Sequence, residues 1–149
     1  MNVRLLATVC ALGALAAAAA PADAAPKTIK KSYTLMLPVP FPVNETMPNM
    51  YGCNNGPEGQ SKNTTTVTFP AAGSLVATVK YTGDWDLYLL DSGGTMVAAS
   101  ESDETGNTGA GQEKITYKKI KKGAKYSIVA CNWLGQKDAT VDYAFTYAK

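Results

Sequence analysis

The sequence predicts an all-β protein: an antiparallel, jelly-roll-like β-sandwich of two sheets with about eight strands. From residue 63 onward, apolar and polar residues alternate with a period of two, which is the pattern of strands with one buried face. Turns that contain glycine separate these segments at intervals of about 8–12 residues. No segment after residue 24 has helical periodicity. A chain of 149 residues has the length of one domain.

Residues 1–24 have the composition of a secretory signal peptide. One cation, Arg4, precedes an apolar run over residues 5–20, and the small-residue pattern Ala22-Asp23-Ala24 follows. The run is about 16 residues long, shorter than the ~20 that a membrane-spanning helix needs. We therefore expect cleavage after Ala24, a secreted, extracellular protein and no membrane span. An uncleaved membrane anchor is the alternative.

Residues 25–62 are predicted to form a strand, an extended arm and a loop that belong to the same domain as the sandwich of residues 63–149. The strand is expected at residues 31–37. The prolines at 38, 40, 42 and 48 exclude a helix and favour extended backbone. Residues 52–60, GCNNGPEGQ, are rich in turn-forming residues and predict a loop.

Seven further strands follow from the alternation, and six of them have a predicted core face. The seventh is a short strand in TMVAAS, at residues 95–100. Turns are expected at Gly73, Gly83, Gly93-Gly94, Gly109, Gly111, Gly123 and Gly135. The predicted core faces consist of these residues: Thr65, Val67 and Phe69; Leu75, Ala77, Val79 and Tyr81; Trp85, Leu87 and Leu89; Ile115 and Tyr117; Tyr126, Ile128 and Ala130; Val141, Tyr143, Phe145 and Tyr147.

Two cysteines remain after the signal peptide, Cys53 and Cys131. An even number of cysteines in an exported protein predicts a disulfide. This disulfide would close a loop of about 80 residues and stabilise the fold by about 4–4.5 kcal/mol if its effect is on chain entropy. Two buried free thiols are the alternative.

The composition excludes several classes of activity. The chain contains no histidine, which excludes a Ser-His-Asp triad, a Cys-His pair and histidine-based zinc sites. Arg4 is the only arginine, so arginine clamps on phosphate are absent after the signal peptide. A net charge of +2 is too small to indicate nucleic-acid binding. We expect a monomer that is not an enzyme and has no catalytic residues.

Six segments between Thr64 and Tyr147 follow the motif order of the bacterial pre-peptidase C-terminal domain. They are FPAAGSLVATVKY, DWDLYLLDSGG, MVAASES, GQEKITY, GAKYSIVAC and VDYAFTY. The chain therefore resembles this family, whose members are similar to the collagen-binding modules of bacterial collagenases. The resemblance implies a jelly-roll-like sandwich that accompanies secreted peptidases and, in some members, binds calcium. These 149 residues hold no peptidase domain, which favours a free-standing binding module.

Four oxygen-bearing side chains are candidate calcium ligands. Asp84 and Asp86 lie two residues apart in a predicted strand, and Asp103 and Asn107 lie in the polar loop that follows the next strand. Calcium takes six to eight oxygen ligands, which loops at one end of a sandwich can supply together. The alternative is a set of solvated carboxylates, with Asp91 bonding the backbone of its own turn.

A binding patch is predicted around Trp133 and Tyr51. Trp133 follows Cys131 in a predicted loop, and Tyr51 precedes Cys53 by two residues, so the disulfide would bring the two aromatic rings together. Exposed aromatic rings stack on sugars and on imino-acid-rich peptides. The alternative is that Trp133 covers the disulfide and the edge of the core.

A run of six lysines, between Lys114 and Lys125, is the second candidate binding feature. Lysines in this number attract anionic wall polymers or lipid headgroups. The alternative is that they solvate a hairpin and protect an edge strand from pairing with other chains.

Two functions are consistent with these features. The first is a secreted, non-catalytic module that binds an extracellular polymer, either peptide or polysaccharide. The second is a structural or export-assisting domain of the cell envelope, stabilised by calcium and without a specific ligand.

Overall fold

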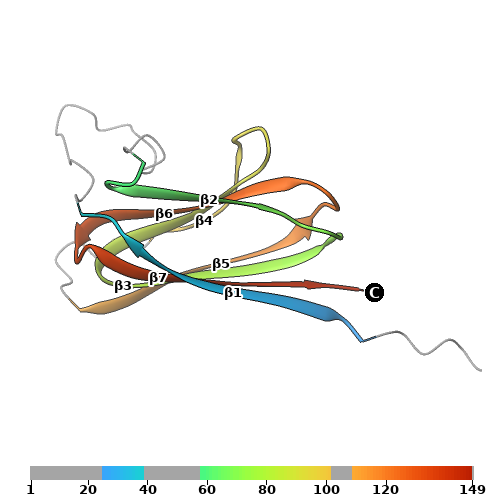
Figure 1. Cartoon of the computed structure of the whole chain (residues 1–149), viewed down its shortest axis with the longest axis horizontal. Helices are drawn as coiled ribbons and strands as arrows, with labels where there is room; N and C mark the ends of the chain where they lie inside the picture. The colour runs from blue at the N-terminus through green and yellow to red at the C-terminus, as the bar shows by residue number, and fades with distance from the viewer. Residues whose placement is uncertain (1–24, 39–57, 102–108, 149) are drawn as a thin grey trace, which may run out of the picture.

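The computed structural model describes residues 25–38, 58–101 and 109–148, and these residues form an antiparallel, all-β fold (Figure 1). This confirms the all-β, antiparallel part of the predicted fold class. No described residue belongs to a helix long and apolar enough to cross a membrane. The strands are β1 (Lys27–Met36), β2 (Lys62–Thr68), β3 (Gly73–Leu90), β4 (Met96–Ser100), β5 (Ala110–Ile120), β6 (Lys125–Gly135) and β7 (Asp138–Tyr147). The predicted signal peptide, proline-rich arm and 102–108 loop lie outside the described residues.

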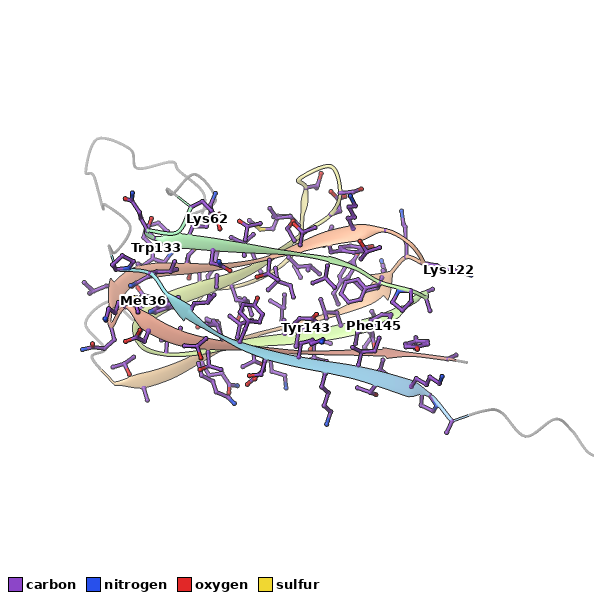
Figure 2. All side chains as sticks on the ribbon, viewed as in Figure 1. Met36, Lys62, Lys122, Trp133, Tyr143 and Phe145 are labelled. Carbon is purple, nitrogen blue, oxygen red and sulfur yellow. The ribbon has the colours of Figure 1, made fainter. Side chains whose placement is uncertain are left out.

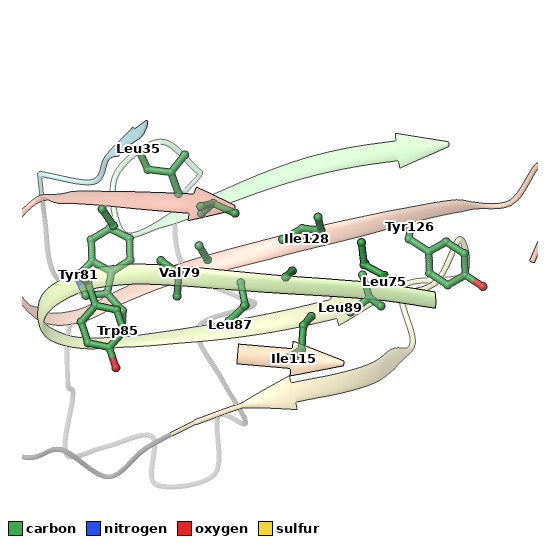
Figure 3. Packing of buried hydrophobic residues seen from close by; sticks show 14 of the residues in the cluster. Leu35, Leu75, Val79, Tyr81, Trp85, Leu87, Leu89, Ile115, Tyr126 and Ile128 are labelled. Carbon is green, nitrogen blue, oxygen red and sulfur yellow. The ribbon is translucent and has the colours of Figure 1, made fainter. Parts of the chain in front are cut away.

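The strand β3 belongs to two arms of one curled sheet. Its residues 73–82 pair with β5 and β7, and β1 extends this first arm beside β7. Its residues 83–90 pair with β4 and β6, and β2 extends this second arm beside β6. Figure 3 shows β3 turning back on itself between the labelled Tyr81 and Trp85. The pairings join all seven strands, so the two separate sheets of the expected sandwich stay a prediction.

Two glycines make this bend possible. Gly83 and Gly135 are register partners, with φ of 111° and 129°, a region that other residues rarely adopt. A Cβ atom on Gly83 would lie 2.2 Å from the carbonyl oxygen of Leu134, and one on Gly135 would lie 2.4 Å from that of Thr82. The prediction of a turn at Gly83 between two strands is wrong, because β3 continues through the bend, and Gly111 likewise lies within β5. The described residues therefore contain seven strands instead of about eight.

One face of β3 supplies the core on both sides of the bend. The odd-numbered residues from Leu75 to Leu89, glycine apart, are all buried in a single apolar cluster, and Trp85 is 0% exposed. Burying each large side chain contributes about 1.5–3 kcal/mol. The other strands add side chains from the faces predicted in the sequence, including Ile115, Ile128, Val141 and Phe145. Most of the predicted core is therefore confirmed, and it lies between the two arms (Figure 3). Thr65 is not part of the cluster, and the predicted residues Val67, Tyr117, Tyr143 and Tyr147 are only partly buried against it.

A buried carboxylate links the arms where β4 lies beside β5. Glu113 in β5 is 4% exposed. The hydroxyl of Tyr81 donates to its Oε1 at 2.9 Å, and the hydroxyl of Ser100 in β4 donates to its Oε2. Since Tyr81 and Glu113 belong to the first arm and Ser100 to the second, these bonds hold the arms together across one side of the core.

We expect Gly83→Ala to lower the free energy of unfolding by about 3 kcal/mol, because the methyl group adds a backbone clash to the strain of a positive φ. Urea denaturation measures the change. Gly94→Ala is the matched control, since Gly94 has φ of 79° with no atom within 4 Å of an added Cβ. The control should cost only the strain, about 1–2 kcal/mol. Equal losses in the two variants would contradict the proposed clash.

Candidate functional site

Asp84 and Asp86 lie just after the bend of β3, and the carboxylate of Asp86 is buried. A bulge separates Asp84 from Trp85, and Asp86 lies on the face opposite the core. Asp86 is nevertheless 6% exposed. Its Oδ2 accepts hydrogen bonds from the hydroxyl of Tyr88 at 2.7 Å and from the indole Nε1–H of Trp133. The carboxylate is therefore held by neighbouring side chains rather than presented to solvent.

The pKa of Asp86 is raised from 3.8 to about 6. Burial is the main cause. The hydrogen bonds from Tyr88 and Trp133 oppose the shift, and the negative charges of Glu101 and Asp84 contribute to it. Burial also raises the pKa of Tyr88, and so does the hydrogen bond from Tyr88 to Asp86. Asp86 therefore changes its charge within the mildly acidic range, close to physiological pH.

The proposed calcium ligands are brought together only in part. Asp84 and Asp86 lie close enough for charge repulsion, whereas Asp103 and Asn107 lie outside the described residues. Within the described ranges, no group of three or more acidic, cysteine or histidine side chains is placed to hold a metal ion. The calcium site therefore stays a prediction.

Asp91 stabilises the turn that follows β3, as the sequence predicts. Its Oδ1 accepts hydrogen bonds from the backbone N–H groups of Gly93 and Thr95, both at 2.9 Å. These bonds close the turn between β3 and β4, and both of them end on the same carboxylate oxygen of Asp91.

Trp133 lies in β6, and the prediction of a loop at this position is wrong. The strand extends to Gly135 because it pairs with β3 up to the glycine contact. The ring of Trp133 is half-buried and packs against a small apolar cluster of Tyr88, Leu90, Val129 and Cys131. Figure 2 shows Trp133 and Met36 at one end of the molecule and Lys122 at the other. Tyr51, the predicted partner of Trp133, lies outside the described residues.

Cys131 is fully buried in the same cluster. It lies between Asp86 of β3 and Lys62 of β2 in the strand register. Its predicted partner Cys53 lies outside the described residues, so the disulfide stays a prediction.

A shallow groove of about 440 Å³ lies on the outer face of the first arm. Two rows of register partners cross β1, β7 and β3 there. The lining residues in these rows are Lys30, Ala144 and Val76, followed by Ser32, Asp142 and Thr78. The groove is hollow at its centre because the side chains of Val76, Thr78 and Ala144 are small, and Lys30 and Lys31 flank it. The sequence analysis missed this groove because its residues come from three distant segments.

Asp142 is the acidic side chain of the groove. The hydroxyl of Ser32 and the ammonium of Lys80 hold its pKa below the usual 3.8. The Lys80 Nζ lies 2.9 Å from its Oδ2, and the two side chains are 59% and 37% exposed. At neutral pH the groove therefore presents an ionised acceptor next to several cations.

No family model matches the chain, and no curated protein matches it in sequence. The family resemblance noted above therefore stays a resemblance. Among solved structures, dimeric latent PorU from Porphyromonas gingivalis is similar with a TM-score of 0.39 and 11% identity, over 88% of this chain and 14% of PorU. A family 35 carbohydrate binding module from Clostridium thermocellum is similar with a TM-score of 0.38 and 15% identity, over 85% of this chain and 100% of that one. Both are β-rich, and neither likeness establishes a shared family or ligand.

We expect the folded protein to be more stable at pH 4 than at pH 7.5 through Asp86. Since the pKa in the folded state is raised to about 6, folding favours the protonated carboxyl. This contribution is full below about pH 4 and is lost as the pH rises through about 6. It amounts to about 2–3 kcal/mol.

Urea denaturation across this pH range, with wild type and Asp86→Asn compared, measures the contribution. The variant has no proton to lose, so its stability should change less between pH 4 and 7.5. Asp138→Asn, at an exposed aspartate, is the control and should follow wild type. Parallel pH profiles for wild type and Asp86→Asn would contradict the role of Asp86.

The predicted disulfide has a direct chemical test. Alkylation of the secreted chain, denatured without a reductant, should leave Cys53 and Cys131 unmodified, whereas prior reduction should expose both. Mass spectrometry of the alkylated peptides measures the outcome. Two modified cysteines without reduction would contradict the disulfide.

Proposed function

We propose that the protein is a secreted, non-catalytic module of the β-sandwich class that binds an extracellular polymer, a peptide or a polysaccharide. The observation that carries this proposal is the groove on the outer face of the first arm. Its volume of about 440 Å³ is within the range of about 300–1,000 Å³ typical of ligand sites. It crosses three strands, so an extended ligand can lie along a surface that the curled sheet keeps rigid.

The chemistry of the groove supports binding rather than catalysis. Its acidic side chain, Asp142, is already paired with Lys80, and the chain has no histidine to act as a general base. The small side chains of Val76, Thr78 and Ala144 admit a ligand without needing to move.

The second candidate function is an envelope domain that assists export or supports structure and is stabilised by calcium. The surroundings of Asp86 favour it, because the charges of Asp84 and Glu101 already disfavour ionisation of this buried carboxylate. A bound cation would relieve that repulsion. Thermal melting with calcium and with a chelator tests this function, and an unchanged midpoint in millimolar calcium would refute it.

A pull-down on collagen, chitin, cellulose and peptidoglycan tests the polymer-binding function. We expect retention on at least one of them, and we expect Ala144→Leu to reduce it about tenfold by filling the groove. Ala99→Leu is the matched control, since Ala99 is exposed on β4 in the second arm. The control should be retained like wild type.

Retention of wild type on no polymer would refute this function. Loss of retention in Trp133→Ala, with Ala144→Leu unaffected, would instead place the site at the patch around Trp133.

A further inference from the structure

The outer face of the first arm is rich in lysine. In the strand register, it includes Lys30 of β1, Lys80 of β3 and Lys114 of β5. Asp142 of β7 is the acidic side chain of the groove among them. This face is therefore cationic, although the net charge of the chain is only +2.

The lysines surround the groove on three strands. Lys30 lies in the row of Val76, Lys114 is the register partner of Thr78, and Lys80 follows on β3. Neighbouring strands are about 4.8 Å apart, so β1 and β5 enclose a surface about 14 Å wide. Lys80 is neutralised by Asp142. No ion pair joins Lys30 or Lys114 to a carboxylate in the part of the chain that the structure describes.

This surface also has hydrogen-bonding groups between its cations. Asp142 is an ionised acceptor, and Ser32 and Thr78 add hydroxyl groups beside it. The one aromatic residue of the groove lining, Tyr143, packs against the core cluster (Figure 2). Stacking on neutral sugars, which needs an exposed ring face, is therefore not the main interaction offered here.

We propose that this face binds an acidic polysaccharide, whose carboxylates pair with Lys30 and Lys114 and whose hydroxyl groups bond to Asp142, Ser32 and Thr78. This inference rests on the polymer-binding function proposed above and specifies its ligand. A peptide fits less well, because the groove lies over the faces of β1, β7 and β3 and not along the free edge of β1. An extended peptide gains affinity mainly from unpaired strand backbone, which the centre of this sheet does not offer.

Isothermal titration calorimetry with polygalacturonate and with its fully methylated ester tests the proposal, since the ester keeps the sugar backbone and replaces each carboxylate charge with a neutral methyl ester. We expect the full chain to bind the acid form, with alginate as a second acidic polysaccharide, and to bind the ester at least tenfold more weakly. Raising the salt concentration from about 50 mM to about 500 mM should weaken binding of the acid form, because exposed charges are screened.

The double variant Lys30→Gln/Lys114→Gln should bind polygalacturonate about fivefold more weakly. The control is Lys122→Gln/Lys125→Gln, which removes the same charge from the other end of the lysine run, outside the groove lining. We assign binding to the groove face and not to the run as a whole, so this control should bind within twofold of wild type. Thermal melts of both variants check that they are folded. An equal loss in the control would overturn the assignment to this face.

The remaining outcomes separate the two proposals. Equal binding of acid and ester would overturn the acidic ligand and leave polymer binding intact. Binding of poly-glutamate as tight as that of polygalacturonate would show that charge alone is recognised and would overturn the polysaccharide. Failure of both acidic polysaccharides would overturn the inference. Failure of these two and of the whole polymer panel together would refute the proposed function itself.

Discussion

The close contact between the backbones of Gly83 and Gly135 is the constraint on which the structure depends. It lets β3 continue through a sharp bend while it stays paired with β6, and so one strand serves both arms. A side chain at either position would meet backbone atoms closer than 2.5 Å and would separate the two strands at the bend. The common core needs this contact, because β3 contributes to it from both arms.

The same bend determines what the two outer faces display. Since the odd-numbered residues of β3 face the core on both arms, the even-numbered ones face outward on both. Before the bend they are Val76, Thr78 and Lys80, which lie at or beside the groove. After it they include Asp86 and Tyr88. The carboxylate of Asp86 accepts hydrogen bonds from Tyr88 and from Trp133. One strand therefore lines the groove on one arm and supplies a buried polar network on the other.

The site was less predictable than the core. Asp91 was assigned correctly because its bonds to Gly93 and Thr95 are local. Trp133 was placed in a loop because the turn residues that follow it indicate an early strand end, whereas pairing with β3 extends the strand. The groove was missed because its residues belong to β1, β3 and β7, which are far apart in the sequence and come together only through strand pairing.

The sequence by itself determined the all-β class, the buried face of nearly every strand and the exclusion of histidine-dependent chemistry. These follow from composition and from alternation with a period of two, which is a local property of the chain. Only the tertiary structure decided that β3 is one strand, that Asp86 is buried beneath Trp133, and that Lys30, Lys80 and Lys114 share a face. These depend on strand register and on the contact between Gly83 and Gly135, which bring together residues far apart in the sequence.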